Sequence, residues 1–197
     1  MIPGGFDLYS ELSRRGALLE GHFRLSSGRH SDRFVQKFRL LEDPALLEPV
    51  AREIAGRFRA AAPTVVVSAA VGGILLGYEV ARALGTKAIF VEKEQGTPVL
   101  RRGFTLSPED RALVVEDVVT TGLSVGEVLK VVRSHGAAIA GIGVIVLRQA
   151  QDDKGGGNAW GVPLEVLLEL PLESYDEASC PQCRAGVPMH DPGSRRT

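Results

Sequence analysis

The chain of 197 residues has few cysteines, no long apolar run and no surplus of basic residues. Its two cysteines, Cys180 and Cys183, lie close together and cannot build a disulfide framework, so a reducing, cytoplasmic setting is expected. The apolar stretch 137–147 is far too short to span a bilayer, and the first ten residues lack the pattern of a signal peptide. A formal net charge of −1 disfavours nucleic acid as a partner. We therefore expect a protein that binds neither membranes nor nucleic acids.

Apolar residues make up 44% of the chain and charged residues 24%, a balance typical of a globular domain. Between 44 and 58, apolar residues recur every four positions, which predicts a helix with one buried stripe. Short runs rich in β-branched residues then alternate with further helical patterns. The predicted helices are 44–58, 72 to about 84, and 125–132, and the predicted strands are 64–67, 87–91, 112–115, 139–147 and 162–168.

This alternation predicts an α/β fold, a central and mainly parallel sheet flanked by helices on both faces. We assign a single domain with a core of about 44–170. The segments 1–43 and 171–197 do not follow the alternation and are expected to form a small hood beside the sheet. Ligands of such sheets bind outside the carboxyl ends of the strands. The loops there are 68–73, 92–111 and 116–124, joined by Arg148 at a strand end.

A segment rich in acids and hydroxyls, VVEDVVTTGLSV (114–125), follows the third predicted strand. We place the end of that strand at Val115, so Glu116 and Asp117 would emerge from it as adjacent carboxylates. Residues 120–124 then lead into a helix, whose N-terminus offers unpaired N–H groups and a partial positive charge to a phosphate. Carboxylates would repel that phosphate, so they must bind hydroxyl groups or a cation. A ribose 5-phosphate satisfies both halves of the segment.

The alternative interpretation of this segment is a capped helix after a surface loop, with threonine and serine serving only as N-caps. A bare TTG before a helix would favour that alternative. The paired acids directly after a buried strand favour the phosphate site instead. The segment lacks the lysine of a Walker loop and does not match GxGxxG.

The segment resembles the signature by which type I phosphoribosyltransferases bind PRPP (5-phosphoribosyl 1-diphosphate): a hydrophobic strand, two acids, two hydrophobic residues and a turn rich in threonine and glycine. The resemblance implies the type I phosphoribosyltransferase fold, with Glu116 and Asp117 on the ribose hydroxyls and 120–124 on the 5′-phosphate. It also implies Mg²⁺ held mainly by PRPP and water, with Asp117 contacting it through water. The residues implied in PRPP binding are Lys93, Glu116, Asp117, Val118, Val119, Thr120, Thr121, Gly122, Leu123 and Ser124.

Nearly the whole chain resembles orotate phosphoribosyltransferases of the bacterial and archaeal branch with a CPxC tail. FRLSSGRHSDRF (23–34) is similar to the segment that lies over the base in that family, which implies that Phe34 contributes to the orotate pocket. Taken alone, this pattern indicates a β-hairpin with a Ser-Gly turn. Arg148 matches the family's arginine, and a guanidinium suits the carboxylate of orotate, although a solvated strand-end arginine is the alternative. The resemblance also implies that Thr120 hydrogen-bonds the base.

The implied reaction transfers ribose 5-phosphate from PRPP to N1 of orotate, giving orotidine 5′-monophosphate and pyrophosphate in pyrimidine biosynthesis. No proton-transfer base is assigned, because the ring nitrogen of orotate can react as an anion. A purine phosphoribosyltransferase of the same fold is one alternative, and it would have no use for Arg148 as a carboxylate clamp. The other is a nucleotide-binding regulator of the same fold, which would be expected to carry a basic face or an added DNA-binding domain.

The polar segment 92–111 contains glycines and prolines and is predicted to be a long loop, a length that commonly marks a lid. In the family this loop reaches the active site of the neighbouring subunit of a homodimer, where a lysine is usual. Arg101 and Arg102 are the expected catalytic substitutes, with Lys93 beside the start of the loop. We therefore expect a homodimer with shared active sites. The alternative is a solvated mobile loop.

The tail CPQCRAGVPMHDPGSR (180–195) contains a C-x-x-C motif, which can indicate zinc or redox chemistry. No thioredoxin-like context surrounds it. Zinc would need two more ligands, and His190 is the only one nearby in the sequence, so a site shared by two chains is favoured over a site within one chain. Two positions depart from the family: Ser26 and Gly72 stand where many orotate enzymes have lysines for the base and the pyrophosphate.

Overall fold

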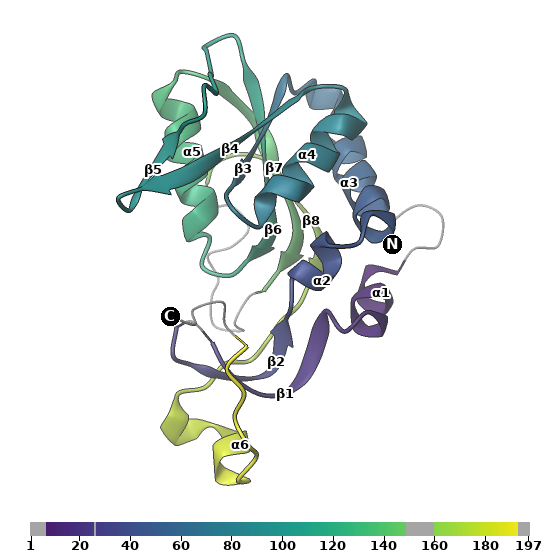
Figure 1. Cartoon of the computed structure of the whole chain (residues 1–197), viewed down its shortest axis with the longest axis vertical. Helices are drawn as coiled ribbons and strands as arrows, with labels where there is room; N and C mark the ends of the chain where they lie inside the picture. Colours follow the sequence, from purple (N-terminus) through teal and green to yellow (C-terminus); the bar gives the residue numbers. More distant parts are fainter. Residues whose placement is uncertain (1–6, 26, 149–159, 193–197) are drawn as a thin grey trace.

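The computed structural model describes residues 7–25, 27–148 and 160–192. Within these residues, six strands form one sheet in the order β5-β4-β3-β6-β7-β8 (Figure 1). All neighbouring strands are parallel except β4 and β5, which are antiparallel. The predicted parallel sheet is thereby confirmed. The strands are β3 (Val65–Ala69), β4 (Lys87–Glu94), β5 (Thr97–Leu100), β6 (Arg111–Val119), β7 (Ala138–Leu147) and β8 (Leu164–Glu169).

Helices cover both faces of this sheet, as the alternation predicts (Figure 1). On one face lie α3 (Pro44–Phe58), which continues into the 3-10 turn η1 (Arg59–Ala61), and α4 (Gly73–Leu84); on the other lies α5 (Leu123–Ser134). Successive residues of a strand point to opposite faces. Val66 therefore packs with α3 and α4, whereas Val65 and Val67 pack with α5. The sheet thus separates two apolar cores, and its loops lie outside both.

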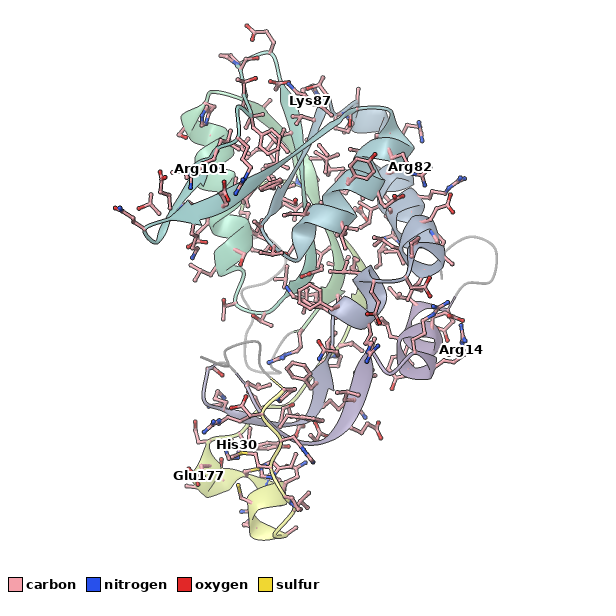
Figure 2. The ribbon with its side chains drawn as sticks, in the orientation of Figure 1. Arg14, His30, Arg82, Lys87, Arg101 and Glu177 are labelled. Atoms are coloured by element: carbon pink, nitrogen blue, oxygen red, sulfur yellow. The ribbon has the colours of Figure 1, made fainter. Side chains whose placement is uncertain are left out.

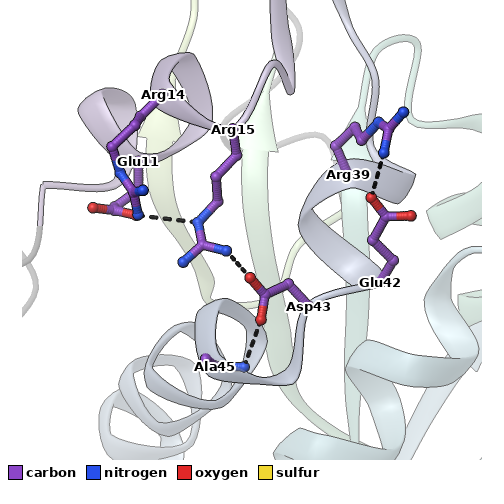
Figure 3. A network of polar contacts seen from close by, with 7 residues as sticks. All are labelled: Glu11, Arg14, Arg15, Arg39, Glu42, Asp43 and Ala45. Atoms are coloured by element: carbon purple, nitrogen blue, oxygen red, sulfur yellow. Dashed lines mark hydrogen bonds and ion pairs between the residues drawn. The ribbon is translucent and has the colours of Figure 1, made fainter.

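Part of the hood is fixed to the α3 side of the sheet. Leu8 and Leu12 of α1 (Leu8–Arg14) pack into the same core as α3, and so do the leucines of α2 (Phe38–Leu41). Asp43 caps α3 by accepting a hydrogen bond from the Ala45 N–H at 2.9 Å, and its other oxygen forms an ion pair with Arg15 (Figure 3). The segment before α3 is thereby held against the end of α1.

The rest of the hood forms a separate small unit below the sheet in Figure 1. It consists of β1 (Leu18–Arg24) and β2 (His30–Val35), which pair antiparallel, and of the tail 171–192, with η2 (Glu177–Ser179) and α6 (Pro181–Arg184). The tail pairs with both strands: the backbones of His30 and Tyr175 exchange two hydrogen bonds of 2.8 Å, and the His190 N–H donates to the His22 carbonyl at 2.7 Å. We call β1, β2 and this tail the hairpin–tail unit.

Two boundaries differ from the predictions. The strand predicted to end at Val115 continues to Val119, because parallel pairing with β7 extends beyond the acids, so Glu116 and Asp117 lie within β6. The long loop predicted over 92–111 is also wrong: its first part completes β4 and forms β5, joined by a tight turn at Gln95 and Gly96. Its polar composition reflects a two-stranded ribbon exposed to solvent. None of the described helices has the length and apolar character needed to cross a membrane.

Candidate active site

Two buried carboxylates stand near the carboxyl end of β6. Glu116 is 6% exposed and Asp117 is 2% exposed. Burial is the main cause that raises the pKa of Glu116 from 4.5 to about 8, and repulsion from Asp117 adds to it. At neutral pH the Glu116 carboxyl is therefore largely protonated and can both donate and accept hydrogen bonds. Such a pair suits the hydroxyl groups of a sugar.

Asp117 meets a cation from the hood. Nζ of Lys37 lies 3.0 Å from Oδ2 of Asp117 and donates a hydrogen bond to Oδ1 at 3.3 Å. Oδ1 also accepts the N–H of Val118 at 2.7 Å. Within the described part of the chain, Oδ2 is buried and accepts no well-formed hydrogen bond. The ammonium of Lys37 offsets the charge of this oxygen, which can in addition accept a hydrogen bond from a ligand hydroxyl or water.

The loop before α4 closes over the same acid. A side-chain carbon built on Gly72 would collide with Asp117 and lie 2.6 Å from Nζ of Lys37. The ammonium group of Lys37 thus stands where a side chain at 72 would begin. A cis peptide bond joins Ala70 and Val71 in this loop.

The segment between β6 and α5 surrounds a small depression of about 40 Å³ lined by residues 116 and 118–125. Gly122, which has no side chain, caps α5 with a left-handed φ of 74°. The Leu123 N–H makes one long hydrogen bond of 3.4 Å to Oγ1 of Thr121, which leaves the start of the helix open to a ligand. A side-chain carbon at 122 would lie 2.5 Å from the ring of Trp160, so both the backbone angle and the space require glycine. The hydroxyl residues Thr120, Thr121 and Ser124 are exposed around the depression. This geometry suits a phosphate group.

Arg148 lies beside this loop. Its backbone N–H donates to the Val119 carbonyl at 2.8 Å, which places it next to Thr120. Burial lowers the pKa of Arg148, and no acidic side chain forms an ion pair with it in the described ranges. A half-buried guanidinium without a carboxylate partner is poised to bind an anionic ligand. Phe34, on β2, precedes Lys37 by three residues and packs against Phe23 with ring centres 5.8 Å apart.

Of the cations predicted to form the lid, Lys93 lies on β4, and Arg101 (labelled in Figure 2) and Arg102 directly follow β5. They form ion pairs with nearby acids: Arg101 with Glu94 at 3.3 Å and Arg102 with Glu92 at 3.0 Å. Lys93 pairs with Glu127 of α5 at 2.8 Å. Among the described residues, these three are not gathered around the acids of β6.

Comparison with known proteins agrees with this arrangement. The model of the phosphoribosyl transferase domain matches residues 39–165. An orotate phosphoribosyltransferase of Pelotomaculum thermopropionicum is 46% identical over 190 residues, covering 96% of this chain and 97% of that protein. One of Thermotoga petrophila is 47% identical over 184 residues, covering 93% and 96%. The chain belongs to the phosphoribosyltransferase family.

A solved structure supports the same family. The crystal structure of orotate phosphoribosyltransferase from Aeropyrum pernix matches with a TM-score of 0.66 and 32% identity, covering 83% of this chain and 94% of that one. The predicted phosphoribosyltransferase signature lies where β6 meets α5, and Glu116 and the hydroxyl loop line one depression. Lys37 was missed by the sequence reasoning. Its only signal was its place just after the segment that carries Phe34.

Proposed function

We propose that the chain is an orotate phosphoribosyltransferase that transfers ribose 5-phosphate from PRPP to N1 of orotate. The observation that carries this proposal is the half-buried Arg148 beside the phosphate loop, without an acidic partner in the described part of the chain. A purine base has no carboxylate to occupy such a guanidinium. The names of the relatives, which cover almost the whole chain, support the same substrate.

In this proposal each end of PRPP binds to a different part of the site. The 5′-phosphate takes the open N-terminus of α5 and the hydroxyls of 120–124. The ribose hydroxyls bind Glu116 and Asp117, and one of them supplies the donor that Oδ2 of Asp117 lacks. The pyrophosphate then lies toward Gly72 and Lys37, whose cation offsets its charge. The carboxylate of orotate binds Arg148.

Attack of N1 on C1 of the ribose breaks the bond to pyrophosphate and inverts C1. Positive charge develops on the ribose ring as that bond breaks, as in glycoside cleavage. An acidic side chain held beside the ring stabilises this charge more in the transition state than in the ground state. The chain's main contribution is to hold both reactants in line, since the orotate anion needs no strong base.

A magnesium ion fits the acid pair. Mg²⁺ prefers oxygen ligands and keeps several waters, so Asp117 would hold it through water. When bound, the ion neutralises charge on the pyrophosphate. The residues of this chain position PRPP around it.

We further propose a homodimer whose β4–β5 ribbons serve neighbouring sites, working in the cytoplasm. Leu75 and Tyr78 lie on one face of α4 and are 49% and 63% exposed, and Val71 just before the helix is 74% exposed. Large exposed apolar side chains that adjoin one another are typical of an interface. Arg101 and Arg102 form ion pairs within their own ribbon and none with the acids of β6 in the described residues, so we propose that they act at the site of the neighbouring chain.

The direct test is release of pyrophosphate from PRPP in the presence of Mg²⁺ with a panel of bases. We expect turnover with orotate and none above background with adenine, hypoxanthine or guanine. Turnover with a purine and not with orotate would establish the purine alternative. Absence of turnover with every base, together with binding of PRPP, would favour a nucleotide-binding regulator.

A further inference from the structure

Four potential metal ligands meet inside the hairpin–tail unit. His22 lies on β1, His30 on β2, and Cys180 and Cys183 on the tail at α6. Three of them are fully buried: Cys180 is 0% exposed, His22 is 2% and His30 is 3%. Figure 2 places His30 beside the tail, far from the six-stranded sheet. The cluster is therefore separate from the phosphoribosyltransferase site.

The distances between the ligand atoms are close to the edges of a tetrahedron. Zinc–sulfur bonds of about 2.3 Å and zinc–nitrogen bonds of about 2.0–2.1 Å at tetrahedral angles place neighbouring ligand atoms roughly 3.3–3.8 Å apart. Here Nε2 of His22 lies 3.1 Å from Nδ1 of His30 and 3.6 Å from each of the two sulfurs. Sγ of Cys183 lies 3.2 Å from Nδ1 of His30. All four ligand atoms lie within 4.8 Å of one another, so small side-chain rotations would complete the tetrahedron.

Hydrogen bonds alone do not account for this convergence. Nδ1 of His22 donates to the Val187 carbonyl at 2.8 Å, because a carbonyl oxygen can only accept. Its Nε2 therefore carries one lone pair, yet three groups approach it: His30, Cys180 and Cys183. One lone pair accepts one good hydrogen bond. A cation at the centre would instead engage all four ligands. The bond to Val187 is also the kind of outer contact that orients a histidine bound to a metal.

We propose that these four side chains bind a structural Zn²⁺ ion within one chain. Two thiolates and two imidazoles in a tetrahedron are a typical zinc ligand set. All four positions are taken by protein and three ligands are buried, so no open position is left for a catalytic water. The sequence suggested His190 as the nearby ligand and a site shared by two chains, whereas the structure brings His22 and His30 of the same chain to the cysteines. The ring of His190 packs toward Phe23, with centres 6.2 Å apart, outside the cluster.

Leu18, Val35 and Leu172 anchor the base of this unit in the main core, and the ion would add a crosslink at its far end. A two-stranded sheet is marginal on its own, and free energy of metal binding becomes free energy of folding when the ligands come together only in the folded state. Zinc would join both strands of the hairpin to the tail. Because β2 ends at Val35, two residues before Lys37, the ion would also fix the strand that leads to the acid pair. The proposal does not depend on which base the enzyme uses.

The first measurement is the metal content of the full chain purified without chelator. We expect about one zinc ion per chain, with two sulfur and two nitrogen neighbours in its X-ray absorption spectrum. Loading the apoprotein with Co²⁺ should give intense tetrahedral d–d bands and a sulfur-to-metal charge-transfer band. Binding should release about two protons per ion, one from each thiol, because cysteine binds metal as the thiolate. A chain free of zinc that also fails to bind Co²⁺ would overturn the proposal.

Variants separate the cluster from its neighbours. His22→Ala and Cys183→Ser should each reduce zinc content and lower the midpoint of thermal unfolding, whereas His190→Ala, the matched control, should keep the full zinc content. Zinc retained by Cys183→Ser, or lost equally in His190→Ala, would contradict the assignment. If Cys180 and Cys183 instead form a disulfide, denatured protein from non-reducing preparations would show no free thiols and no metal. That result would also overturn the proposal, and it would leave orotate turnover, and hence the proposed function, unaffected.

Discussion

The active-site loop and the hairpin–tail unit are assembled in opposite ways. The loop draws the residues of its depression from one short stretch, 116–125, and relies on backbone N–H groups at a helix N-terminus. The cluster in the hairpin–tail unit joins His22 to Cys180 across 158 positions of sequence and relies wholly on side chains. A phosphate site can thus be recognised from a local sequence pattern. A site whose ligands come from distant parts of the chain can be recognised only from the folded structure.

Lys37 is where the two regions meet. It follows β2 of the hairpin–tail unit and forms its ion pair with Asp117 of β6, 80 positions further along the chain. The comparison therefore predicts three kinds of variant. Changes in the loop should affect turnover and leave the fold intact, changes in the cluster should affect stability first, and changes at Lys37 should couple the two.

The largest expected effect is that of Asp117→Asn. Loss of this charge beside a ribose that becomes cationic should reduce kcat by roughly 100-fold or more, by analogy with removal of one preorganised electrostatic contact. Single-turnover rates and circular dichroism would be measured together. Exposed Asp176 on the tail offers a control, since Asp176→Asn should leave kcat unchanged. Near-normal turnover of Asp117→Asn with an intact fold would show that the acid pair is misassigned.

A second prediction concerns stability and pH. The pKa of Glu116 is raised to about 8 in the folded chain from an ordinary value of 4.5. The folded state therefore binds more protons than the unfolded state between these values, so the free energy of unfolding falls as pH rises from about 4.5 to about 8. Glu116→Gln should remove this contribution and stabilise the chain relative to wild type by on the order of 2 kcal/mol at pH 8. The free energy of unfolding of wild type and Glu116→Gln is measured by urea unfolding at several pH values in this range. The same dependence on pH in both proteins would contradict the prediction.

Lys37→Met should have an intermediate effect. A hydrogen bond to a charged group contributes about 1.5–3 kcal/mol, and the partial exposure of Lys37 reduces this, so kcat/KM for PRPP should fall about tenfold. Lys37→Arg should retain much of the activity. The pKa of Glu116 should rise in Lys37→Met, because Lys37 lowers it in the native chain. An effect on orotate alone would place Lys37 with the base instead of the pyrophosphate.

The smallest expected effect tests the shared site of the proposed homodimer: a partial recovery of activity when two inactive variants are mixed. A chain with Arg101→Ala and Arg102→Ala is mixed with an Asp117→Asn chain, each nearly inactive alone. If the ribbons act in the neighbouring site, half of the dimers are mixed and each has one intact site. Activity should then recover toward a quarter of wild type at equal mixing. Failure to recover, after subunit exchange is verified by mass spectrometry, would mean that the ribbon serves its own chain.

The sheet and the phosphate loop could be predicted from the sequence, because apolar alternation and the acid–hydroxyl motif are local patterns. It misplaced the end of β6, since two acids interrupt an apolar run, whereas pairing with β7 carries the strand to Val119. It took the β4–β5 ribbon for a loop because glycine and proline there suggest irregular structure. Neither Lys37 nor the pairing of His22 with the cysteines follows from spacing alone. Each depends on tertiary contacts between distant segments.

The central claim is that Arg148 selects a base that carries a carboxylate. The most direct test compares two bases, with and without the carboxylate, in wild type and in an Arg148 variant. Turnover of orotate and of uracil, which lacks the carboxylate, is measured with wild type and with Arg148→Ala. A charge-assisted pair to a bound anion contributes about 2–5 kcal/mol, so wild type should prefer orotate by roughly 30-fold or more. In Arg148→Ala the KM for orotate should rise far more than that for PRPP, and most of the preference should vanish. An undiminished preference for orotate in Arg148→Ala would contradict the account.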